Sequence, residues 1–432
     1  MYRIAMDELH KWKQRDNKKP LIIRGARQVG KTWLMKEFGK TAYEEAVYIN
    51  FDNNIQMQML FDGDIDITRI ITGLELYVGH KINPQNTLMI FDEIQEVPKA
   101  LTSLKYFNEN APQYQIVCAG SLLGVALHPG TSFPVGKIEF MDLYPLSFFE
   151  FMDAMGLERY VEILHKDDYE MATTFRQEYE MQLRHYYYVG GMPEAVSNFS
   201  QNKNFNQVRE IQQNILQAYQ QDFSKHAPNE IVPRIRMLWN SIPTQLAREN
   251  KKFVYGLIKE GARAKEYELA LLWLIDCGLV HKVNRVSVPQ MPLVAYEDLK
   301  AFKLFQLDVG LLSCMAGLHQ KVLLNGNDLF KEFKGALTEQ YVLQQLKSAR
   351  GLQTYYWTAD KGTAEIDFVI SNGMDIAPVE VKAETNLQAK SLKNYRDKFQ
   401  PKQSIRTSMA DYKVEEGLLN LPLWAIENVA HL

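Results

Sequence analysis

Eight consecutive residues near the start of the chain have the types and spacing that bind phosphate. Gly25, Ala26, Arg27, Gln28, Val29, Gly30, Lys31 and Thr32 follow the pattern GxxxxGK[ST] of a phosphate-binding loop. Backbone N–H groups of such a loop surround the phosphates, and the N-terminus of the following helix adds partial positive charge. We expect Lys31 to reach the β- and γ-phosphates of ATP and the Thr32 hydroxyl to coordinate Mg²⁺. The alternative is a chance match, which occurs in roughly one or two per cent of chains this long.

A second segment supplies the acidic residues that hydrolysis of a phosphate anhydride requires. The apolar run Leu88–Phe91 ends in Asp92 and Glu93. Asp92 would hold Mg²⁺ through a water molecule or beside Thr32, and Glu93 would orient or deprotonate the attacking water. Taken alone, the segment also fits a buried strand with a polar end. Its position after the phosphate-binding loop favours the catalytic interpretation, because charge neutralisation and a positioned nucleophile are then both present.

A third polar residue follows another apolar run. Ile116–Ala119 leads into Gly120 and Ser121, where nucleotide-sensing ATPases carry a polar side chain near the γ-phosphate. The alternative is that Ser121 caps the following turn, as serine does without any ligand. Ser121 is therefore a candidate catalytic residue with a structural alternative.

The pattern around these residues predicts the scaffold that positions them. Apolar runs alternate with helical patterns through residues 1–150, which predicts a parallel sheet with crossover helices. A helix is expected from Thr32 to Phe38, and the expected strands are Leu21–Ile23, Ala46–Asn50, Leu88–Phe91 and Gln115–Ala119. The expected fold class is therefore α/β, with a P-loop parallel sheet.

A second charged constellation lies near the end of the chain. Thr363–Ile370 and Ile376–Lys382 alternate charged with apolar residues on either side of Asn372-Gly373, which predicts a hairpin with a two-residue turn. In that register Glu365 lies opposite Glu380, and Asp367 lies diagonal to Glu380 with Cβ atoms within about 8 Å. One face then carries Glu365, Asp367, Glu380 and Lys382, and the other carries Ile366, Phe368, Val379 and Val381.

An Asp on one strand and Glu-x-Lys on the next is the pattern of the PD-(D/E)xK nuclease superfamily. In that interpretation Asp367 and Glu380 bind Mg²⁺ or Mn²⁺, and Lys382 polarises the attacking water. Upstream, Glu339 falls on an otherwise apolar helix face, and a buried carboxylate needs a partner or a metal. The alternative is a solvated hairpin in which Glu and Lys pair across the strands.

Several of these segments together resemble a family of bacterial and archaeal AAA+-type ATPases with a C-terminal domain of unknown function. The resemblance covers nearly the whole chain and implies ATP binding and hydrolysis at Gly25–Thr32, Asp92 and Glu93; it also points to Glu339. Relatives commonly carry arginine where this chain has Lys137, which keeps the charge but not the forked donor geometry. The segments that carry the resemblance are Gly25–Thr32, Phe91–Gln95, Ala119–Ser121, Tyr144–Ser147, Gly190–Glu194 and Lys303–Gly310.

The length of 432 residues predicts about three domains, give or take one. We expect a P-loop AAA+-type core at 1–150 and a helical domain at 151–229. A winged-helix-like domain is expected at 230–290, where helices precede two short runs, Leu279–Val283 and Val286–Val288, around Asn284-Arg285. The remainder, 291–432, is expected to be an α/β restriction-endonuclease-like domain.

Composition limits the setting and the partners. Cys118, Cys277 and Cys314 are too few and too far apart for a disulfide framework, and no apolar stretch is long enough to span a membrane, so a cytoplasmic location is expected. A net charge of −3 argues against coating nucleic acid by bulk charge but permits a local basic patch. Such a patch could follow a phosphate backbone or be an ordinary solvated face. Its residues are Lys390, Lys393, Arg396, Lys398, Lys402, Arg406 and Lys413, against Asp397 and Asp411.

Three functional hypotheses follow from the sequence. The first is an Mg²⁺-dependent ATPase whose nucleotide state controls the C-terminal, nuclease-like region. The second is an ATP-gated, metal-dependent DNA endonuclease that uses Glu339, Asp367, Glu380 and Lys382. The third is a binding platform for nucleic acid or protein that has no activity of its own. The sequence permits a homo-oligomer without setting its size.

Overall fold

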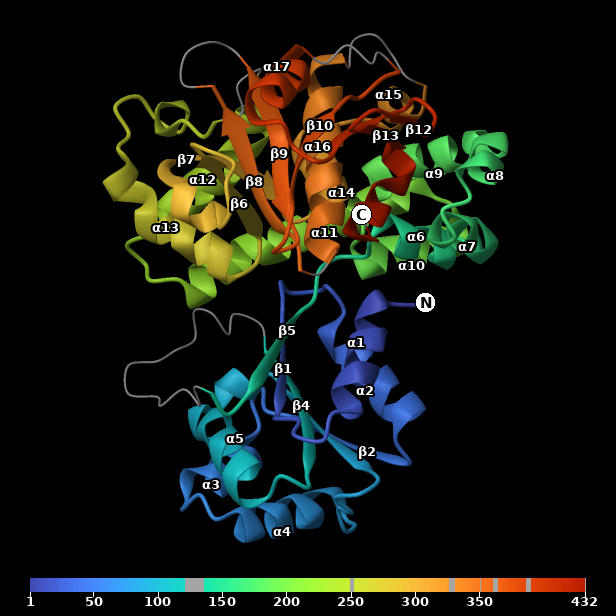
Figure 1. Ribbon diagram of the computed structural model, residues 1–432. Helices are drawn as coiled ribbons and strands as arrows, with labels where there is room; N and C mark the ends of the chain where they lie inside the picture. The colour runs from blue at the N-terminus through green and yellow to red at the C-terminus, as the bar shows by residue number, and fades with distance from the viewer. Residues whose placement is uncertain are drawn as a thin grey trace. The chain divides into compact units, whose positions relative to one another are not determined.

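The computed structural model describes residues 1–120, 136–248, 252–325, 331–349, 351–359, 364–385 and 390–431. The chain forms two compact units. The N-terminal unit comprises Tyr2–Tyr144 with Asp276–Gly278, and the C-terminal unit comprises Pro145–Ile275 and Leu279–Leu432 with Met1. Figure 1 shows the first in blue to cyan-green and the second in green to red.

The N-terminal unit is built on a five-stranded sheet in the order β2-β3-β4-β1-β5, in which every pairing is parallel. The expected parallel sheet is confirmed, and each predicted strand lies within an observed one. Its strands are β1 (Leu21–Arg24), β2 (Glu45–Asn50), β3 (Thr87–Asp92), β4 (Gln115–Ala119) and β5 (Glu139–Asp142). Its helices are α1 (Ile4–Lys13), α2 (Lys31–Ala42), α3 (Ile55–Asp62), α4 (Ile67–Val78) and α5 (Pro98–Asn110).

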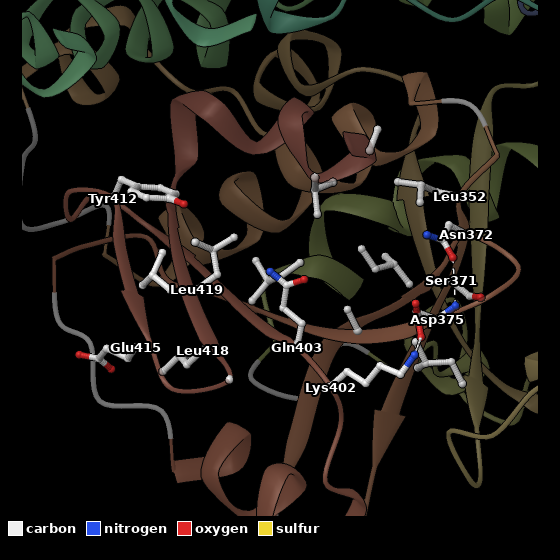
Figure 2. Close-up of a pocket in the computed structure, with 18 residues that line it drawn as sticks. Leu352, Ser371, Asn372, Asp375, Lys402, Gln403, Tyr412, Glu415, Leu418 and Leu419 are labelled. Atoms are coloured by element: carbon white, nitrogen blue, oxygen red, sulfur yellow. Dashed lines mark hydrogen bonds and ion pairs between the residues drawn. The ribbon is translucent and has the colours of Figure 1, made fainter. Parts of the chain in front are cut away.

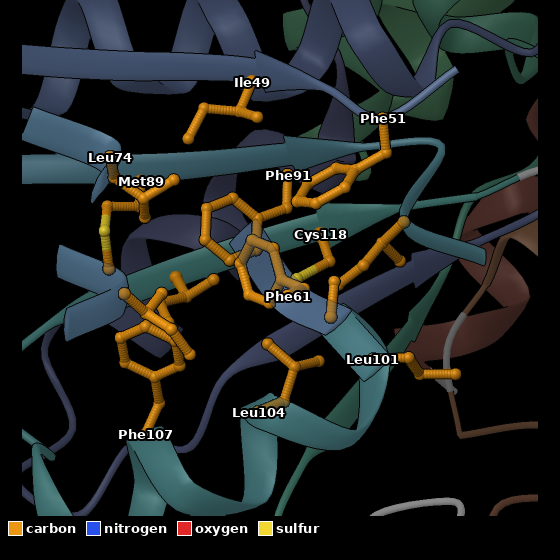
Figure 3. Close-up of a cluster of buried hydrophobic side chains, with 14 of the residues drawn as sticks. Ile49, Phe51, Phe61, Leu74, Met89, Phe91, Leu101, Leu104, Phe107 and Cys118 are labelled. Atoms are coloured by element: carbon orange, nitrogen blue, oxygen red, sulfur yellow. The ribbon is translucent and has the colours of Figure 1, made fainter. Parts of the chain in front are cut away.

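An aromatic cluster anchors the strand that ends in Asp92. Phe91 lies edge-to-face with Phe51, with ring centroids 5.4 Å apart, and with Phe61 and Phe107 at 6.4 Å (Figure 3). Aromatic pairs of this kind contribute about 0.5–1.5 kcal/mol each beyond the area they bury. Because Phe91 is fully buried in this cluster, the backbone that carries Asp92 is held in place.

The C-terminal unit begins with helices, which cover most of residues 151–229, the range expected to be helical. The helices are α6 (Phe148–Ala154), α7 (Glu158–His165), α8 (Tyr169–Thr174), α9 (Arg176–Val189), α10 (Pro193–Asn202), α11 (Phe205–His226), α12 (Val232–Leu246) and α13 (Ala264–Asp276). Within the described residues, a 3-10 helix, η5 (Leu423–His431), follows the last strand, and four more α-helices lie between the strands of this unit: α14 (Val309–Met315), α15 (Gln320–Asn325), α16 (Lys331–Ser348) and α17 (Lys390–Phe399).

An eight-stranded mixed sheet in the order β12-β13-β11-β10-β9-β8-β6-β7 forms the rest of this unit. Its first two strands are β6 (Val280–Val286) and β7 (Glu297–Gln306), followed by β8 (Gln353–Thr358) and β9 (Glu365–Ser371). The others are β10 (Ile376–Val381), β11 (Ser404–Ser408), β12 (Lys413–Glu415) and β13 (Leu418–Pro422).

The hairpin expected around Asn284-Arg285 is wrong. β6 continues unbroken through these residues and pairs with β7, with only a register shift between Asn284 and Arg285. The physical reason is that neither residue supplies the glycine that tight two-residue turns favour, while Val280, Val283 and Val286 keep the strand buried. Because β6 shares one sheet with β7–β13, the boundary expected at residue 290 falls inside a sheet. The winged-helix-like domain expected at 230–290 stays a prediction.

The acidic hairpin exists, but its predicted register is wrong by two residues. β9 and β10 are antiparallel with Ile376 opposite Ser371 and Val379 opposite Phe368, so Glu365 does not oppose Glu380. The turn is longer than two residues because the Asn372 side chain accepts hydrogen bonds from the Met374 and Asp375 N–H groups. This Asx-type turn closes a four-residue loop instead of the expected two-residue one.

The strict alternation expected in β9 is interrupted as well. Opposite β8, Trp357 pairs with Ile366 and Tyr355 pairs with Val369, so β9 contains one residue more than β8 over the same span. Both Ile366 and Val369 pack into the cluster beneath α17. The extra residue is a β-bulge, and such bulges redirect the side chains near them.

One buried carboxylate explains two of the segments that carry the family resemblance. Asp308 accepts hydrogen bonds from the Gly191 N–H at 2.6 Å and the Leu311 N–H at 2.9 Å. A Cβ added to Gly190 would lie 2.1 Å from Asp308 Oδ1, and one added to Gly191 would lie 2.1 Å from the Leu146 carbonyl oxygen. The glycines are therefore required by packing within the C-terminal unit.

Candidate functional site

The phosphate-binding loop connects the end of β1 to the start of α2. Its backbone is unusual at three positions, with φ of 150° at Gly25, 66° at Gln28 and 96° at Gly30. Gly30 is the N-cap of α2 in the left-handed region, which glycine adopts without steric cost. A Cβ at Gly25 would lie 2.3 Å from the Leu143 carbonyl oxygen, so only glycine fits there. The sequence thus places glycine where the loop turns most sharply.

Lys31 lies over the loop that precedes it. Its ammonium group donates hydrogen bonds to the carbonyl oxygens of Gly25 at 2.8 Å and Ala26 at 2.7 Å. Burial lowers the pKa of Lys31 to about 8, although the negative charges of Glu93 and Asp92 oppose that shift. Lys31, Asp92 and Glu93 therefore lie within electrostatic range of one another, as the sequence predicts.

Asp92 receives hydrogen bonds from two hydroxyl groups. Thr32 donates to Asp92 Oδ2 at 2.7 Å, and Tyr48 donates to the same oxygen at 2.9 Å. The Tyr48 pKa is raised by burial and by the neighbouring Asp92 charge, so the hydroxyl stays protonated as a donor. Tyr48, on β2, is a residue that sequence reasoning missed.

Glu93 follows β3 in a strained conformation. Its φ is 51°, in the left-handed region that residues other than glycine rarely adopt, and its N–H donates to Asp92 Oδ1 at 3.2 Å. Gln95 Nε2 donates to Glu93 Oε2 at 2.6 Å and orients the carboxylate. Backbone strain of this kind persists where surrounding structure enforces it, often at functional sites. Gln95 is a second residue whose role the sequence did not reveal.

A residue of the N-terminal segment, Arg3, also forms hydrogen bonds that hold the phosphate-binding loop. Buried Arg3 donates to the Val29 carbonyl oxygen at 3.1 Å and to the Tyr144 carbonyl oxygen at 2.7 Å. Nothing in the spacing of the sequence connects Arg3 to the loop, so only the fold reveals this contact. Lys137, where the resemblance led us to expect arginine, forms an ion pair with Glu109 at 2.9 Å.

The end of β4 lies between β1, which leads into the phosphate-binding loop, and β3, which ends in Asp92. Ala119 pairs with Ile23 on one side and with Asp92 on the other. The candidate Ser121 lies outside the described residues and stays a prediction.

Residues 17–152 match the family model of an AAA domain. That range contains the whole phosphate-binding loop and both acids. Together with the parallel sheet and the loop geometry, the match supports a P-loop ATPase of the AAA type in the N-terminal unit.

Two further family models match the rest of the chain, and both describe domains of unknown function. One covers residues 180–322 (DUF8612) and the other covers 334–426 (DUF4143). No curated protein matches the chain.

Among solved structures, the chain is similar to the Walker-type ATPase PABY2304 of Pyrococcus abyssi. The identity is 13% and the TM-score 0.44, with 72% of this chain and 94% of that chain covered. It is also similar to the Aeropyrum pernix Orc1 protein solved in complex with DNA, at 10% identity and a TM-score of 0.26, covering 73% and 90%. Cdc6p of Pyrobaculum aerophilum is 11% identical with a TM-score of 0.25, covering 74% and 93%.

Outside the AAA domain, the acidic hairpin brings its charged residues together around two ammonium groups, of which that of Lys303 is buried and that of Lys382 is partly exposed. Lys303 on β7 is fully buried, and its ammonium lies 2.5 Å from Glu365 and 3.6 Å from Glu339. Lys382 forms an ion pair with Glu380 at 2.7 Å. Asp367, near the bulge, accepts a hydrogen bond from the Val381 N–H at 2.8 Å. Sequence reasoning found the acids and Lys382 but missed Lys303 as their partner.

The pKa values of this cluster show how strongly its charges interact. Burial raises the pKa of Glu380, while the charge and hydrogen bond of Lys382 oppose that rise. Burial lowers the pKa of Lys303, but Glu339, Glu365 and Asp367 outweigh it, so the net shift is upward and Lys303 stays charged. Within the described residues, no group of three or more His, Cys, Asp or Glu side chains is arranged to hold a metal ion.

A separate pocket of about 520 Å³ lies beside the turn between β9 and β10 (Figure 2). The acidic cluster lies at the opposite ends of these two strands. The lining of the pocket is largely aliphatic, including Leu418 and Leu419, and an ion pair between Lys402 and Asp375 at 2.7 Å borders it. None of the clustered acids lines it, so it shares no chemistry with them. No helix within the described residues is long and apolar enough to cross a membrane.

Proposed function

We propose that the protein is an Mg²⁺-dependent ATPase that binds ATP at Gly25–Thr32 and hydrolyses it with Asp92 and Glu93. The hydrogen bond between Thr32 and Asp92 at 2.7 Å carries this proposal. It joins the loop helix to the end of β3, which are the two elements that a phosphate–metal site requires. The family match over residues 17–152 supports the same function.

The residues present fit a magnesium ion. A threonine hydroxyl and a carboxylate are hard oxygen ligands, and Mg²⁺ is commonly held by one or two protein oxygens together with phosphate oxygens and water. When bound, Mg²⁺ would neutralise charge on the β- and γ-phosphates. We assign Thr32 and Asp92 to hold it.

The other residues of the site act on the phosphates and on water. Lys31 exchanges its hydrogen bonds to the Gly25 and Ala26 carbonyl oxygens for phosphate oxygens, and the loop N–H groups bind the remaining phosphate charge. Glu93, held by Gln95, orients the attacking water and accepts its proton.

Titration calorimetry with ATP and Mg²⁺ tests this function. Wild type is expected to bind ATP, and Lys31→Ala is expected to lose at least about tenfold in affinity, because a charge-assisted contact to phosphate disappears. Lys40→Ala is the matched control, since it removes the same charge from the exposed side of α2. Equal affinities for wild type and Lys31→Ala, or no binding by either, would overturn the proposal.

We propose further that the nucleotide state changes the behaviour of the C-terminal unit. This part of the proposal rests on the joining of an ATPase domain and a second unit in one chain. Hydrogen exchange should differ between ATP-bound and ADP-bound Glu93→Gln in peptides from residues 145–432. Exchange differences confined to residues 1–144 would contradict such control.

The second candidate function is metal-dependent cleavage of DNA in the C-terminal unit. The ion pair of Glu380 with Lys382, together with Asp367 beside it, favours this candidate. Four carboxylates and two ammonium groups leave the cluster with a formal charge of −2, which suits a divalent cation if Glu380 turns from Lys382 toward it. We assign Asp367 and Glu380 to hold Mg²⁺ or Mn²⁺, with Lys382 polarising water and Glu339 completing the acidic group.

Incubation of plasmid DNA with Mg²⁺ or Mn²⁺ tests this candidate. Wild type should nick the DNA, Lys382→Ala should not, and Lys402→Ala should cleave like wild type because Lys402 lies outside the cluster. Cleavage that survives Lys382→Ala would indicate a contaminating nuclease. DNA binding without cleavage would support the third hypothesis, a platform without catalytic activity.

A further inference from the structure

A basic groove lies between helix α17 and strand β11 in the C-terminal unit. It encloses about 670 Å³, and its lining includes Lys393, Arg396, Asp397 and Arg406. Three positive and one negative side chain therefore line it, and Glu415 lies close enough to Arg406 and Arg396 to interact with both. The aliphatic floor is formed by Leu392 and Leu418, which belong to the hydrophobic cluster beneath the helix.

The Arg406 side chain in the groove is buried and held in place by a hydrogen bond. Its residue is only 6% exposed, and its Nε donates to Asn420 Oδ1 at 3.2 Å. Asn420 is itself fixed, because its amide donates to the Asp411 carbonyl oxygen at 2.6 Å and its oxygen accepts from Ser408 at 3.0 Å. A guanidinium held in this way loses little conformational freedom when it binds an anion.

The two cations from α17 lie one turn apart on the same side of the helix. Arg396 donates to the Glu416 carbonyl oxygen at 2.5 Å, which fixes its position against the β12–β13 turn. A Cβ on Gly417 would lie 3.2 Å from the Arg396 guanidinium, so glycine in that turn makes room for it. Lys393 is exposed and belongs to the lining of the groove.

The groove and the acidic cluster are connected by two neighbouring strands, β11 and β10. Arg406 on β11 pairs in register with Glu380 on β10, and neighbouring strands lie about 4.8 Å apart. An extended anionic polymer that follows the groove would therefore pass beside the residues assigned to phosphodiester chemistry.

We propose that this groove binds the phosphodiester backbone of a nucleic acid through Lys393, Arg396 and Arg406. The ligand class rests on the DNA-directed candidate function, but the proposal requires neither cleavage nor ATP hydrolysis. Arg406 and Arg396 supply forked donors that match phosphate oxygens, and Lys393 adds a mobile charge at the rim.

The test uses the full chain without metal or nucleotide and measures fluorescence anisotropy of labelled duplex and single-stranded DNA. Lys393→Gln/Arg396→Gln and Arg406→Gln are compared with Lys402→Gln/Lys11→Gln. The control removes two exposed lysines that pair with Asp375 and Glu8 and that do not line the groove. Calorimetry with ATP reports separately on the N-terminal unit, so failure of the groove and failure of the ATPase proposal are distinguishable.

We expect the groove variants to bind DNA about tenfold more weakly than wild type at moderate salt. The slope of log affinity against log salt should fall by about one for each phosphate contact removed. Because Arg406→Gln removes a buried group, the exposed Lys393→Gln substitution alone must show the same slope change. Absence of DNA binding by wild type, or equal losses in the groove and control variants, would overturn the proposal. Displacement of DNA by inorganic phosphate at an ionic strength at which chloride leaves it bound would also overturn it, since the groove would then be a site for a single phosphate.

Discussion

The Thr32 hydroxyl donates a hydrogen bond to Asp92 Oδ2 at 2.7 Å, and the two residues are 60 positions apart in the chain. The same oxygen accepts a second hydrogen bond, from the Tyr48 hydroxyl at 2.9 Å. Asp92 is thus oriented by two neutral donors before any ligand binds. Because neither donor neutralises its charge, the carboxylate keeps its capacity to hold a cation.

The pairing predicts how Thr32 variants behave. Thr32→Val keeps the shape of the side chain but removes the hydroxyl, so ATP turnover should fall at least about tenfold and require more Mg²⁺. Thr32→Ser restores a hydroxyl and should recover most of the activity. Phosphate release measured across a range of Mg²⁺ concentrations separates the two variants. Equal turnover by the valine and serine variants would show that the hydroxyl has no such role.

The depressed pKa of Lys31 predicts a pH dependence of ATP binding. With a pKa of about 8 in the free protein, Lys31 loses its proton as the pH rises through that value, whereas bound phosphates favour the charged form. Affinity should therefore fall by up to about tenfold per pH unit above about pH 8. Calorimetry in buffers of different ionisation heat should detect proton uptake on binding. A constant affinity between about pH 7 and 9.5 would contradict this assignment.

The nucleotide site was largely predictable because its signals are local. The pattern Gly25–Thr32 specifies both the turn residues and the ligands within one segment, and an apolar run marks the strand before Asp92. Tyr48 and Arg3 were not predictable, because their roles come from long-range contacts made only after folding. Such contacts leave no spacing in the sequence.

The acidic hairpin was only partly predictable, because its register and partners depend on residues outside its own pattern. Alternation correctly identified the two strands, but the register depends on the turn, and the side-chain hydrogen bonds of Asn372 lengthen that turn. The bulge in β9 depends on the opposing strand, β8, which lies outside the hairpin. Lys303 enters the cluster from β7, about sixty residues upstream, so local pattern reasoning could not pair it with Glu365.

Packing at Gly191 predicts a large cost for a small substitution. Gly191→Ala should destabilise the C-terminal unit by several kcal/mol, on the order of 3 or more, because its Cβ would overlap the Leu146 carbonyl oxygen. Gly335→Ala is the matched control, since that glycine lies in α16 with no atom near its Cβ position. The control should be neutral or stabilising by up to about 1 kcal/mol. Thermal unfolding of both variants measures the contrast, and similar melting temperatures would refute it.

Glu427 predicts a pH-dependent stability. Burial raises its pKa to about 8, although the Phe149 N–H donates to its carboxylate at 2.7 Å. Because this folded value exceeds that of an unfolded glutamate, its contribution to stability is complete below about pH 4.5 and falls as the pH rises toward 8. Glu427→Gln keeps the acceptor oxygen and removes the titration. The stability gained by this variant should grow from about pH 5 to pH 8, and a gain independent of pH would contradict the assignment.

Lys303 offers the sharpest test of the acidic cluster. Its ammonium is fully buried between Glu365 and Glu339, so Lys303→Met removes the buried positive charge that both carboxylates face. Breaking a buried pair in this way costs about 3–5 kcal/mol. Lys402→Met removes an ion pair whose lysine side chain is 83% exposed, and it should cost less than about 1 kcal/mol. Urea denaturation followed by tryptophan fluorescence measures both.

A double variant then separates the effect of burial from that of charge. Lys303→Met/Glu365→Gln removes one charge of each sign, so it should recover part of the loss because the net charge of the cluster returns to that of wild type. If Mg²⁺ or Mn²⁺ binds the cluster, either ion should stabilise Lys303→Met more than wild type, since the variant carries one additional net negative charge there. Equal stabilisation of both proteins would place the metal outside this cluster. The Lys303 ammonium would then be a structural counter-ion of Glu339 and Glu365.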